Sequence, residues 1–221
     1  MRNLDIGCGK AKRSQFIGVD MIEGPEVDVL CDISSDRLPF DDLSVDHVYS
    51  AHSIEHIAQD RLLHVFQEMT RVSAHGGLIE LWHPHVSHSD AFVFGHINYL
   101  SEALYDHLGC SHRAFWAQGF GGAQWILEEV RYGIDQFVLE DVQEAGIDID
   151  FAVSYFREII KELGAFIRVD RSGVPGPSQY RRSVCVMWNR TDTIRQLTDG
   201  PRRRSLSTAR RIAQLSSDRS F

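Results

Sequence analysis

The first twenty residues constrain the fold more than any other part of the chain. Leu4 and Ile6 flank Asp5 in a short apolar run that stops at the turn Gly7-Cys8-Gly9, and a second apolar run ends at Asp20. Strands that end in a glycine turn and in a carboxylate hold nucleosides in α/β folds. Glycine lets the backbone approach the ligand, and the carboxylate accepts hydrogen bonds from ribose hydroxyls. The run therefore predicts a nucleoside site at the edge of a parallel sheet.

The order of residues within this run narrows the choice of nucleoside ligand. Asp5 lies inside the apolar run, before the glycines, and the turn has no third glycine of the kind that packs a helix under a pyrophosphate. These two details favour S-adenosylmethionine over a dinucleotide.

Apolar runs and turns alternate over the first 82 residues. They predict strands over Asn3–Ile6, Phe16–Asp20, Val27–Cys31, Val45–Ser50 and Leu78–Trp82, a loop over Ser34–Ser44 and one helix over Arg61–Val72. This alternation is typical of a parallel sheet that is covered on both faces.

The regular pattern breaks after the fifth predicted strand. Residues 83–146 are rich in His, aromatic residues and Gly, and we interpret them as a substrate or lid insertion with short helices over Ser101–Leu108 and Gln124–Val130. A helix over Ile149–Leu163 is then expected to end at Gly164. Strands over Ala165–Val169 and Ser183–Trp188 would form a terminal hairpin around the Gly173–Pro177 reversal.

Four segments in order carry a resemblance to a known family. They are the Asp5–Gly9 turn, Cys31–Ile33, the strand ending in Ser53-Ile54-Glu55-His56, and the Arg71–Gly77 turn. Together they resemble the class I S-adenosylmethionine-dependent methyltransferases. The resemblance implies an α/β, Rossmann-like fold with a seven-stranded, mostly parallel sheet, an antiparallel last strand and an insertion after strand five.

Only fifteen positions separate Asp5 from Asp20, so no helix of normal length fits between the glycine turn and the second strand, and a compact subgroup of this family shows the same contraction. Its members also have a Pro-His-x-Ser segment followed by Ala-aromatic and a later His, and Pro84–Ser87, Ala91-Phe92 and His96 are similar to these. The Asp-Pro-Thr of that motif is replaced here by other residues, including Phe94-Gly95. The subgroup resemblance implies a small molecule or glycan as the methyl acceptor.

The family resemblance also implies which residues bind the cofactor, S-adenosylmethionine. Asp20 would hold the ribose hydroxyls, Asp32 and Ile33 would face the adenine, and the glycine turn would lie under the amino-acid end. The predicted cofactor residues are Asp5, Gly7, Cys8, Gly9, Asp20, Met21, Asp32, Ile33 and Ala51.

Histidines mark the expected acceptor side, because an imidazole pKa near 6.5 suits proton abstraction at neutral pH. We predict His85, His88, His52 and Glu55 as catalytic residues. Loop hydrogen bonding is the alternative role for the histidines, and fixing the helix start after the fourth strand is the alternative role for Glu55. The predicted substrate-binding residues are His83, His85, His88, His96, Tyr99 and Trp116. We predict no metal site, because His83, His85 and His88 lack a familiar ligand spacing.

Charge is divided unevenly along the chain. Residues 190–221 contain eight Arg and three Asp, a net of +5, so the formal net charge of −8 leaves −13 for residues 1–189. We predict a methyltransferase domain over 1–189 and a basic tail over 190–221. The acidic body argues against a broad nucleic-acid footprint, and a homodimer is compatible with the sequence.

The four cysteines are scattered and no apolar run is long enough to span a membrane, so we expect a cytoplasmic protein. The predicted function is methyl transfer from S-adenosylmethionine to a small molecule or saccharide, at oxygen in preference to nitrogen. Two alternatives stay open. One is an RNA methyltransferase that uses the arginine-rich tail, and the other is a non-catalytic, methyltransferase-like binding subunit.

Overall fold

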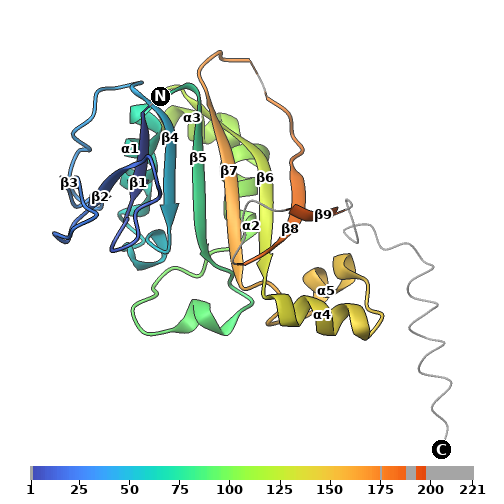
Figure 1. Cartoon of the computed structure of the whole chain (residues 1–221). Coiled ribbons are helices and arrows are strands. Elements are labelled where there is room, and N and C mark those ends of the chain that lie inside the picture. The colour runs from blue at the N-terminus through green and yellow to red at the C-terminus, as the bar shows by residue number, and fades with distance from the viewer. Residues whose placement is uncertain (1, 175, 188–192, 198–221) are drawn as a thin grey trace, which may run out of the picture.

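A central sheet runs through the whole molecule (Figure 1). The computed structural model describes residues 2–174, 176–187 and 193–197, and within them nine strands lie in the order β3-β2-β1-β4-β5-β7-β6-β8-β9. The strands are β1 (Asn3–Ile6), β2 (Ile17–Asp20), β3 (Val29–Leu30), β4 (Val45–Ala51), β5 (Ser73–Pro84), β6 (Gln124–Ile134), β7 (Glu162–Asp170), β8 (Arg181–Val186) and β9 (Thr193–Leu197).

Strands β1 to β5 are parallel, and β7 lies antiparallel between β5 and β6. This confirms the predicted Rossmann-like sheet with one antiparallel strand near its end. The described sheet has two more strands than the seven predicted, namely β6, which pairs with β7 and β8, and β9, which pairs antiparallel with β8.

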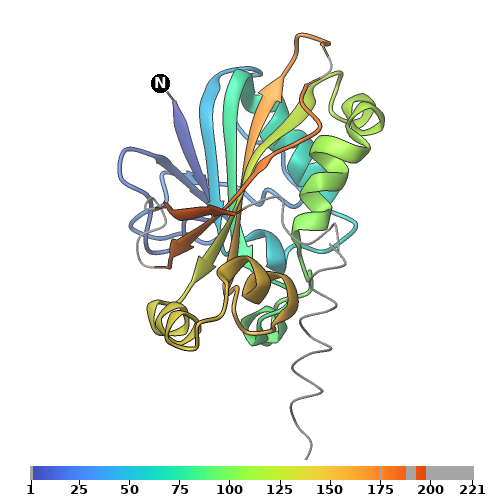
Figure 2. The same cartoon turned by 90° about the vertical axis from the view of Figure 1, so that its right-hand side faces the viewer.

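Helices α1, α2 and α3 lie on one face of the sheet, which corrects the expectation of cover on both faces. They stand behind the strands in Figure 1 and to the right of them in Figure 2, while α4 and α5 extend beyond the lower end of the sheet. The helices are η1 (Ile54–His56), α1 (Leu62–Val72), η2 (Ser89–Phe92), α2 (Glu102–Asp106), the π-helical turn η3 (His107–Ser111), α3 (Arg113–Gly119), α4 (Gln136–Glu144) and α5 (Ile149–Tyr155).

Aromatic and charged side chains line the face that these helices leave open. Arg13 lies over the Tyr49 ring at 4.5 Å and donates to Glu80, which also accepts from Trp82 Nε1 at 2.8 Å. Burial opposes the ionisation of Glu80, but hydrogen bonds from His47 and Trp82 and the charge of Arg13 lower its pKa to about 2. The loop that carries Arg13 thus takes the place of a covering helix.

The first half of the chain folds close to the predicted elements. The predicted ranges for β1, β2, β4 and α1 agree within a residue or so at each end, and residues 7–16 form turns and loop with no helix, as the short spacing indicated. Leu4, Val48 and Ile79 are fully buried on adjacent strands, since a parallel sheet buries apolar side chains on its covered face.

The predicted helix over Gln124–Val130 is wrong, because this segment is strand β6 near the middle of the sheet. Its register shifts between Leu127 and Glu129, which breaks the period-2 alternation that identifies a strand in a sequence. Trp125, Leu127 and Val130 are all buried. The predicted insertion therefore contains a core strand as well as loops.

The predicted helix over Ile149–Leu163 is wrong in its second half. Helix α5 ends at Tyr155, and β7 begins at Glu162. Gly164 is a strand residue in close contact with a neighbouring strand, since a Cβ added there would lie 2.6 Å from the Trp82 ring. The prediction that Gly164 ends a helix is therefore wrong.

The predicted terminal hairpin is also wrong. Strand β7 pairs with β5 and β6, and β8 lies on the far side of β6, so the two strands that were expected to pair are separated. Trp188 lies outside the described residues, and of the predicted basic tail the structure describes only β9.

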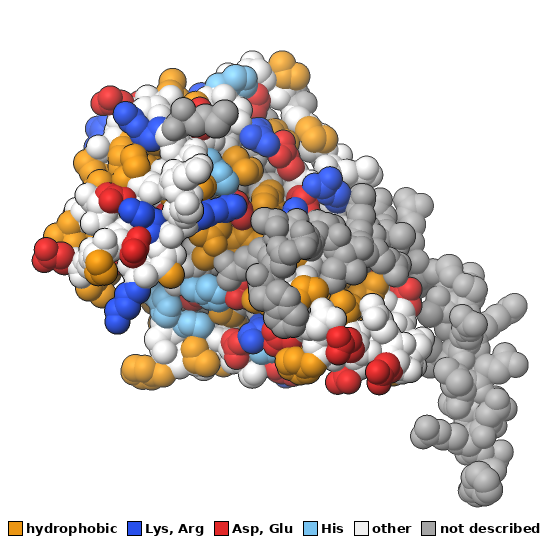
Figure 3. Space-filling model, in the orientation of Figure 1, with side chains coloured by type: hydrophobic (Ala, Val, Ile, Leu, Met, Phe, Trp, Pro, Cys, Tyr) orange, Lys and Arg blue, Asp and Glu red, His pale blue; other side chains and the backbone are white. Residues whose placement is uncertain are grey.

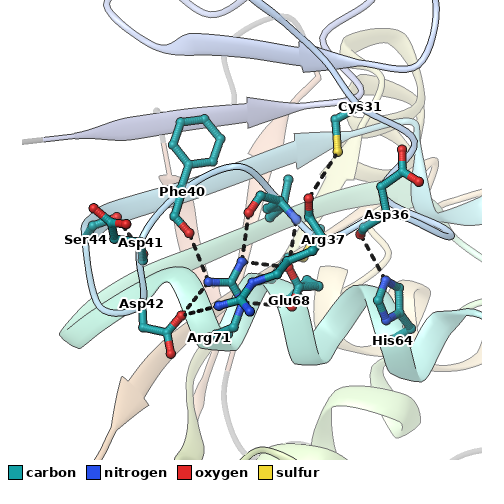
Figure 4. Close-up of polar contacts among 12 residues, drawn as sticks. Cys31, Asp36, Arg37, Phe40, Asp41, Asp42, Ser44, His64, Glu68 and Arg71 are labelled. Atoms are coloured by element: carbon teal, nitrogen blue, oxygen red, sulfur yellow. Dashed lines mark hydrogen bonds and ion pairs between the residues drawn. The ribbon is translucent and has the colours of Figure 1, made fainter.

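The loop between β3 and β4 is fixed to α1 by a network of polar contacts centred on Arg71 (Figure 4). Arg71 donates to the carbonyls of Leu38 and Phe40 at 2.9 Å each, and it forms ion pairs with Asp42 and Glu68. Glu68 in turn accepts from the Leu38 amide. This loop begins at residues 31–34, so the network helps to hold one wall of the site described below.

In the part of the chain that the structure describes, no helix combines the length and the apolar character that crossing a bilayer requires.

Candidate active site

A cleft of about 490 Å³ opens at the carboxyl ends of β1 to β4. Its volume is within the roughly 300–1,000 Å³ of small-ligand pockets, and its position is the usual ligand site of an open α/β sheet. The lining residues are Ile6, Gly7, Gly9, Val19, Asp20, Met21, Ile22, Cys31, Asp32, Ile33, Ser34, His52, Ser53, His56, Ile57 and Ala58.

The glycine turn after β1 forms the floor of the cleft. Gly7 has φ +71°, and a Cβ there would overlap the side chain of Ser53, which follows β4. The Gly7 amide donates to Val19 O at 2.8 Å, so the turn stays against β2. Only glycine combines this backbone conformation with so close an approach.

Asp20 stands at the end of β2 and is already partly bonded. Its Oδ2 accepts from the Gly9 amide and its Oδ1 from the Ile22 amide, both at 2.9 Å. A carboxylate has about four lone-pair sites. Each Asp20 oxygen therefore keeps capacity for a ribose hydroxyl, and the side chain fits its predicted role.

Asp32 and Ile33 form the opposite wall. Asp32 Oδ1 accepts from the Ser34 amide and hydroxyl at 2.9 and 2.6 Å, and the hydroxyl bond lowers the pKa of Asp32. Ile33 and Cys31 are buried and add apolar surface beside this carboxylate. A polar edge next to an apolar wall suits a purine base.

Three predicted cofactor residues do not line the cleft. Asp5 is buried and accepts from the Arg13 amide at 2.6 Å, and burial raises its pKa, so it holds the loop after the glycine turn. Burial also raises the pKa of Cys8 to about 11, which makes it a packing residue. Ala51 is the last residue of β4, directly before the lining residue His52.

His52 is held between two carboxylates at the other end of the cleft. Its Nε2 lies 2.7 Å from Glu162 Oε1, and its Nδ1 lies 3.4 Å from Glu55 Oε1. The hydrogen bonds to Glu162 and Glu55 raise the pKa of His52 to about 9. The ring is therefore an imidazolium at neutral pH and does not act as a base there.

The partner Glu162 was not predicted, because its segment was assigned to a helix. Glu162 is the first residue of β7 and pairs with Pro84 at the carboxyl end of β5. Strand β5 lies next to β4, and His52 directly follows β4, so Glu162 comes within reach of the His52 ring. Glu55, which was predicted, is only 2% exposed, and its Oε2 has no hydrogen-bond partner among the described residues. Burial opposes its ionisation, but the contact with His52 lowers the pKa of Glu55.

His83 lies behind this pair with no exposed surface. Its Nδ1 lies 2.9 Å from Pro84 O, its ring stacks on Tyr105, and burial lowers its pKa to about 4. A direct contact of His83 with substrate does not fit this placement.

His85 and His88 are bonded within their own segment and are absent from the cleft lining. His85 Nδ1 contacts the Ser87 hydroxyl at 2.7 Å, and burial lowers the pKa of His85 to about 4. His88 caps η2 through the Asp90 amide and lies 3.5 Å from Glu158. These contacts correspond to the loop-bonding role.

The three remaining predicted substrate residues separate in space. His96 packs edge-on against His56 of the cleft, with ring centroids 4.7 Å apart, and Tyr99 stacks on Phe92 in the same loop. Trp116 belongs to α3, which lies near the upper end of the sheet in Figure 1, away from the carboxyl ends of β4 and β5. Histidine side chains gather over the lower edge of the sheet in the space-filling view (Figure 3).

Comparison with protein families decides the class of this cleft. Residues 4–81, which contain the glycine turn, Asp20, Asp32 and the His52–His56 segment, match the family model described as a methyltransferase domain. The predicted enzyme class, an S-adenosylmethionine-dependent methyltransferase, and the predicted cofactor are thereby confirmed.

Solved structures with a similar fold come from several microorganisms. A SAM-dependent methyltransferase from Archaeoglobus fulgidus is 16% identical, with a TM-score of 0.50 over 76% of this chain and 85% of that chain. An S-adenosylmethionine-dependent methyltransferase from Mesorhizobium loti is 16% identical, with a TM-score of 0.46 over 76% and 90%. The first supports the fold of the methyltransferase. No curated protein sequence matches the chain.

Proposed function

We propose that this methyltransferase transfers a methyl group from S-adenosylmethionine to a hydroxyl oxygen of a small molecule or saccharide, as in the compact subgroup that its sequence resembles. The observation that carries the proposal is the composition of the cleft beyond the cofactor end. His52, Ser53 and His56 line it there, and the carboxylates of Glu55 and Glu162 stand behind His52. Such groups pair with a hydroxylated acceptor better than with an apolar one.

The residues at the other end of the cleft fit the cofactor. The backbone of Gly7 and Gly9 lines the cleft at this end, and Asp20 offers lone pairs that a ribose could use. Asp32 and Ile33 would face the adenine. When bound, S-adenosylmethionine supplies an electrophilic methyl group on a sulfonium sulfur.

His52 would act as a positioning residue beside the acceptor. Because both ring nitrogens face carboxylates, the imidazolium is fixed in orientation. A fixed positive charge at this place would favour the deprotonated form of an acceptor hydroxyl, whose proton passes to water before the methyl group is transferred. The backbone at His52 has φ +53°, so the ring is presented from a tight turn directly after β4.

We further propose that residues 85–100, rather than the whole predicted insertion, form the acceptor side. This segment lies below the carboxyl ends of β4 and β5 in Figure 1, and its Ile97 amide donates to Glu55 O. Closure of such a segment over the cleft would exclude water from the methyl donor.

Calorimetry with S-adenosylmethionine and S-adenosylhomocysteine tests the cofactor end. We expect Asp20→Ala to weaken binding by at least about tenfold, since two ribose hydrogen bonds are lost. Asp141→Ala, at an exposed position on α4, should bind as the native protein does. Equal affinity of native protein and Asp20→Ala would contradict the assignment.

Methyl-labelled cofactor tests the acceptor class. Incubation with pools of hydroxylated small molecules, saccharides and RNA should place the label in a small molecule or saccharide. Label in RNA, with transfer that weakens steeply as salt rises, would instead support the RNA alternative. Cofactor binding without label in any pool would favour the non-catalytic alternative.

A further inference from the structure

Three potential metal ligands meet at the wall of the cleft. Glu55, His56 and His96 each offer one ligand atom, and these atoms lie within 4.8 Å of one another. Glu55 and His56 belong to η1, which follows β4, whereas His96 comes from the loop between η2 and α2. Residues forty positions apart in the chain thus converge on one point.

The loop that brings His96 is fixed to η1 by backbone contacts. The amides of Ile97 and Asn98 both donate to Glu55 O, at 2.9 and 3.2 Å. The Asn98 side chain, which is buried, donates to the carbonyls of Ile54 and Ile57. Four hydrogen bonds therefore hold the two segments together on either side of the cluster.

The hydrogen bond made by His56 leaves a lone pair for a ligand. Its Nδ1 lies 2.9 Å from Gly95 O, and a carbonyl only accepts, so the proton is on Nδ1 and Nε2 is unprotonated in the neutral ring. Gly95 has φ +97°, a conformation that favours glycine and turns this carbonyl toward His56. A backbone carbonyl on the second nitrogen is the usual orienting partner of a metal-binding histidine.

The other two side chains carry buried atoms without a hydrogen bond. His96 Nδ1 and Glu55 Oε2 are both buried and have no hydrogen-bond partner among the described residues. Glu55 is 2% exposed, and its other oxygen, Oε1, faces His52. Leaving such groups unpaired costs about 1–3 kcal/mol each, and more for a charged group. A cation would satisfy both at once.

We propose that Glu55, His56 and His96 bind a divalent transition-metal ion. Two imidazoles and one carboxylate with open positions form the ligand set of facial Fe²⁺ sites and of several Zn²⁺ sites, and they are too rich in nitrogen for Mg²⁺ or Ca²⁺. His56 also lines the cleft, so the ion lies at its acceptor end. There it would lower the pKa of an acceptor hydroxyl as a Lewis acid. This role rests on the proposed function, whereas the binding does not.

Titration of the chelator-treated, full-length protein with Co²⁺ tests the site, because Co²⁺ bound to His and carboxylate absorbs visible light. We expect one equivalent per chain in the native protein. Affinity should fall at least about tenfold in His96→Ala and in Glu55→Gln. His112→Ala removes an exposed histidine outside the cluster and should leave the affinity unchanged. Circular dichroism and thermal unfolding verify that each variant folds, and His96→Asn replaces His96→Ala if the latter does not.

Two results would overturn the metal site. One is the absence of a saturable one-equivalent site in the native protein, and the other is equal Co²⁺ affinity in the native protein and both cluster variants. Calorimetry with S-adenosylmethionine on the same samples separates this proposal from the proposed function. Co²⁺ binding without cofactor binding would uphold the metal site and overturn the function. Cofactor binding without a Co²⁺ site would overturn the metal site alone.

Discussion

At the scale of single residues, the cleft depends on side chains whose surroundings change their chemistry. His52 would be the obvious base from its pKa in water, yet Glu162 and Glu55 hold it as a cation. The surroundings also decide why a glycine is required at a given position. Gly7 is required by its conformation and by Ser53, whereas Gly164 is required by contact with the Trp82 ring.

The charge on His52 makes stability depend on pH. Since the folded pKa of about 9 lies above the ordinary histidine pKa of 6.5, the contribution is fully present below pH 6.5 and is lost as pH rises through about 9. Urea unfolding across this range should show a fall in the free energy of unfolding that is smaller in His52→Asn. Asn tolerates the φ of +53° found at this position. A parallel fall in both proteins would contradict the ion-pair assignment.

Gly164 allows a second prediction at this scale. Gly164→Ala should reduce the free energy of unfolding by about 1–3 kcal/mol, because the new methyl group overpacks the buried Trp82 ring. Gly119→Ala is the matched control, since a Cβ there meets nothing within 4 Å. It should be neutral or slightly stabilising. Chemical denaturation measures both, and equal losses would show that the Trp82 contact is unimportant.

At the scale of elements, the sheet is conventional but its connections are not. Loops rather than helices join β1, β2 and β3, and a network centred on Arg71 ties the β3–β4 loop to α1. Arg71 forms ion pairs with Asp42 and Glu68 and also satisfies two carbonyls. The wall that carries Asp32 thus depends on a side chain forty residues away.

Removing that arginine should destabilise the protein and the cleft together. We expect Arg71→Met to lower the free energy of unfolding by about 2–4 kcal/mol, because Glu68 and two carbonyls lose their partner. Arg37→Met removes an exposed arginine that also contacts Asp42, and it should cost less than about 1 kcal/mol. Urea denaturation of both variants gives the comparison. Similar losses would mean that the network contributes little.

At the scale of the whole molecule, the cleft is built from four strand ends and the proposed acceptor side from a distant loop. Residues 7–22, 31–34 and 52–58 surround one volume, and residues 95–98 bind against 54–57. A ligand in the cleft therefore stabilises segments that are far apart in the sequence.

Hydrogen exchange should reveal this coupling. With S-adenosylmethionine at about 100 times its Kd, global stability rises by about 2.7 kcal/mol. Exchange should slow most in the three segments that surround the cleft, and peptides from α3 and α4 should change no more than the global effect requires. Mass spectrometry with and without ligand measures it, and uniform slowing over all peptides would argue against binding in this cleft.

Residues 4–81 could be predicted from the sequence because their signals are local. Neighbouring residues alone define the apolar run of β1, the glycine turn and the carboxylate at Asp20. The order of these motifs identified both the fold and the cofactor. The spacing between Gly9 and Asp20 also fixed the absence of a helix there. Elements of this kind depend little on distant parts of the chain.

The remaining features were decided by tertiary structure. The bulge in β6 and the close approach at Gly164 exist only in the packed sheet, so alternation and glycine placement misled the prediction of both strands. Glu162 meets His52 because β7 inserts beside β5, and His96 meets Glu55 because a loop folds back onto η1. The sequence determined the residues proposed for the cofactor end, since each belongs to a short local motif within residues 6–34. Contacts between segments distant in the chain decided the proposed acceptor end.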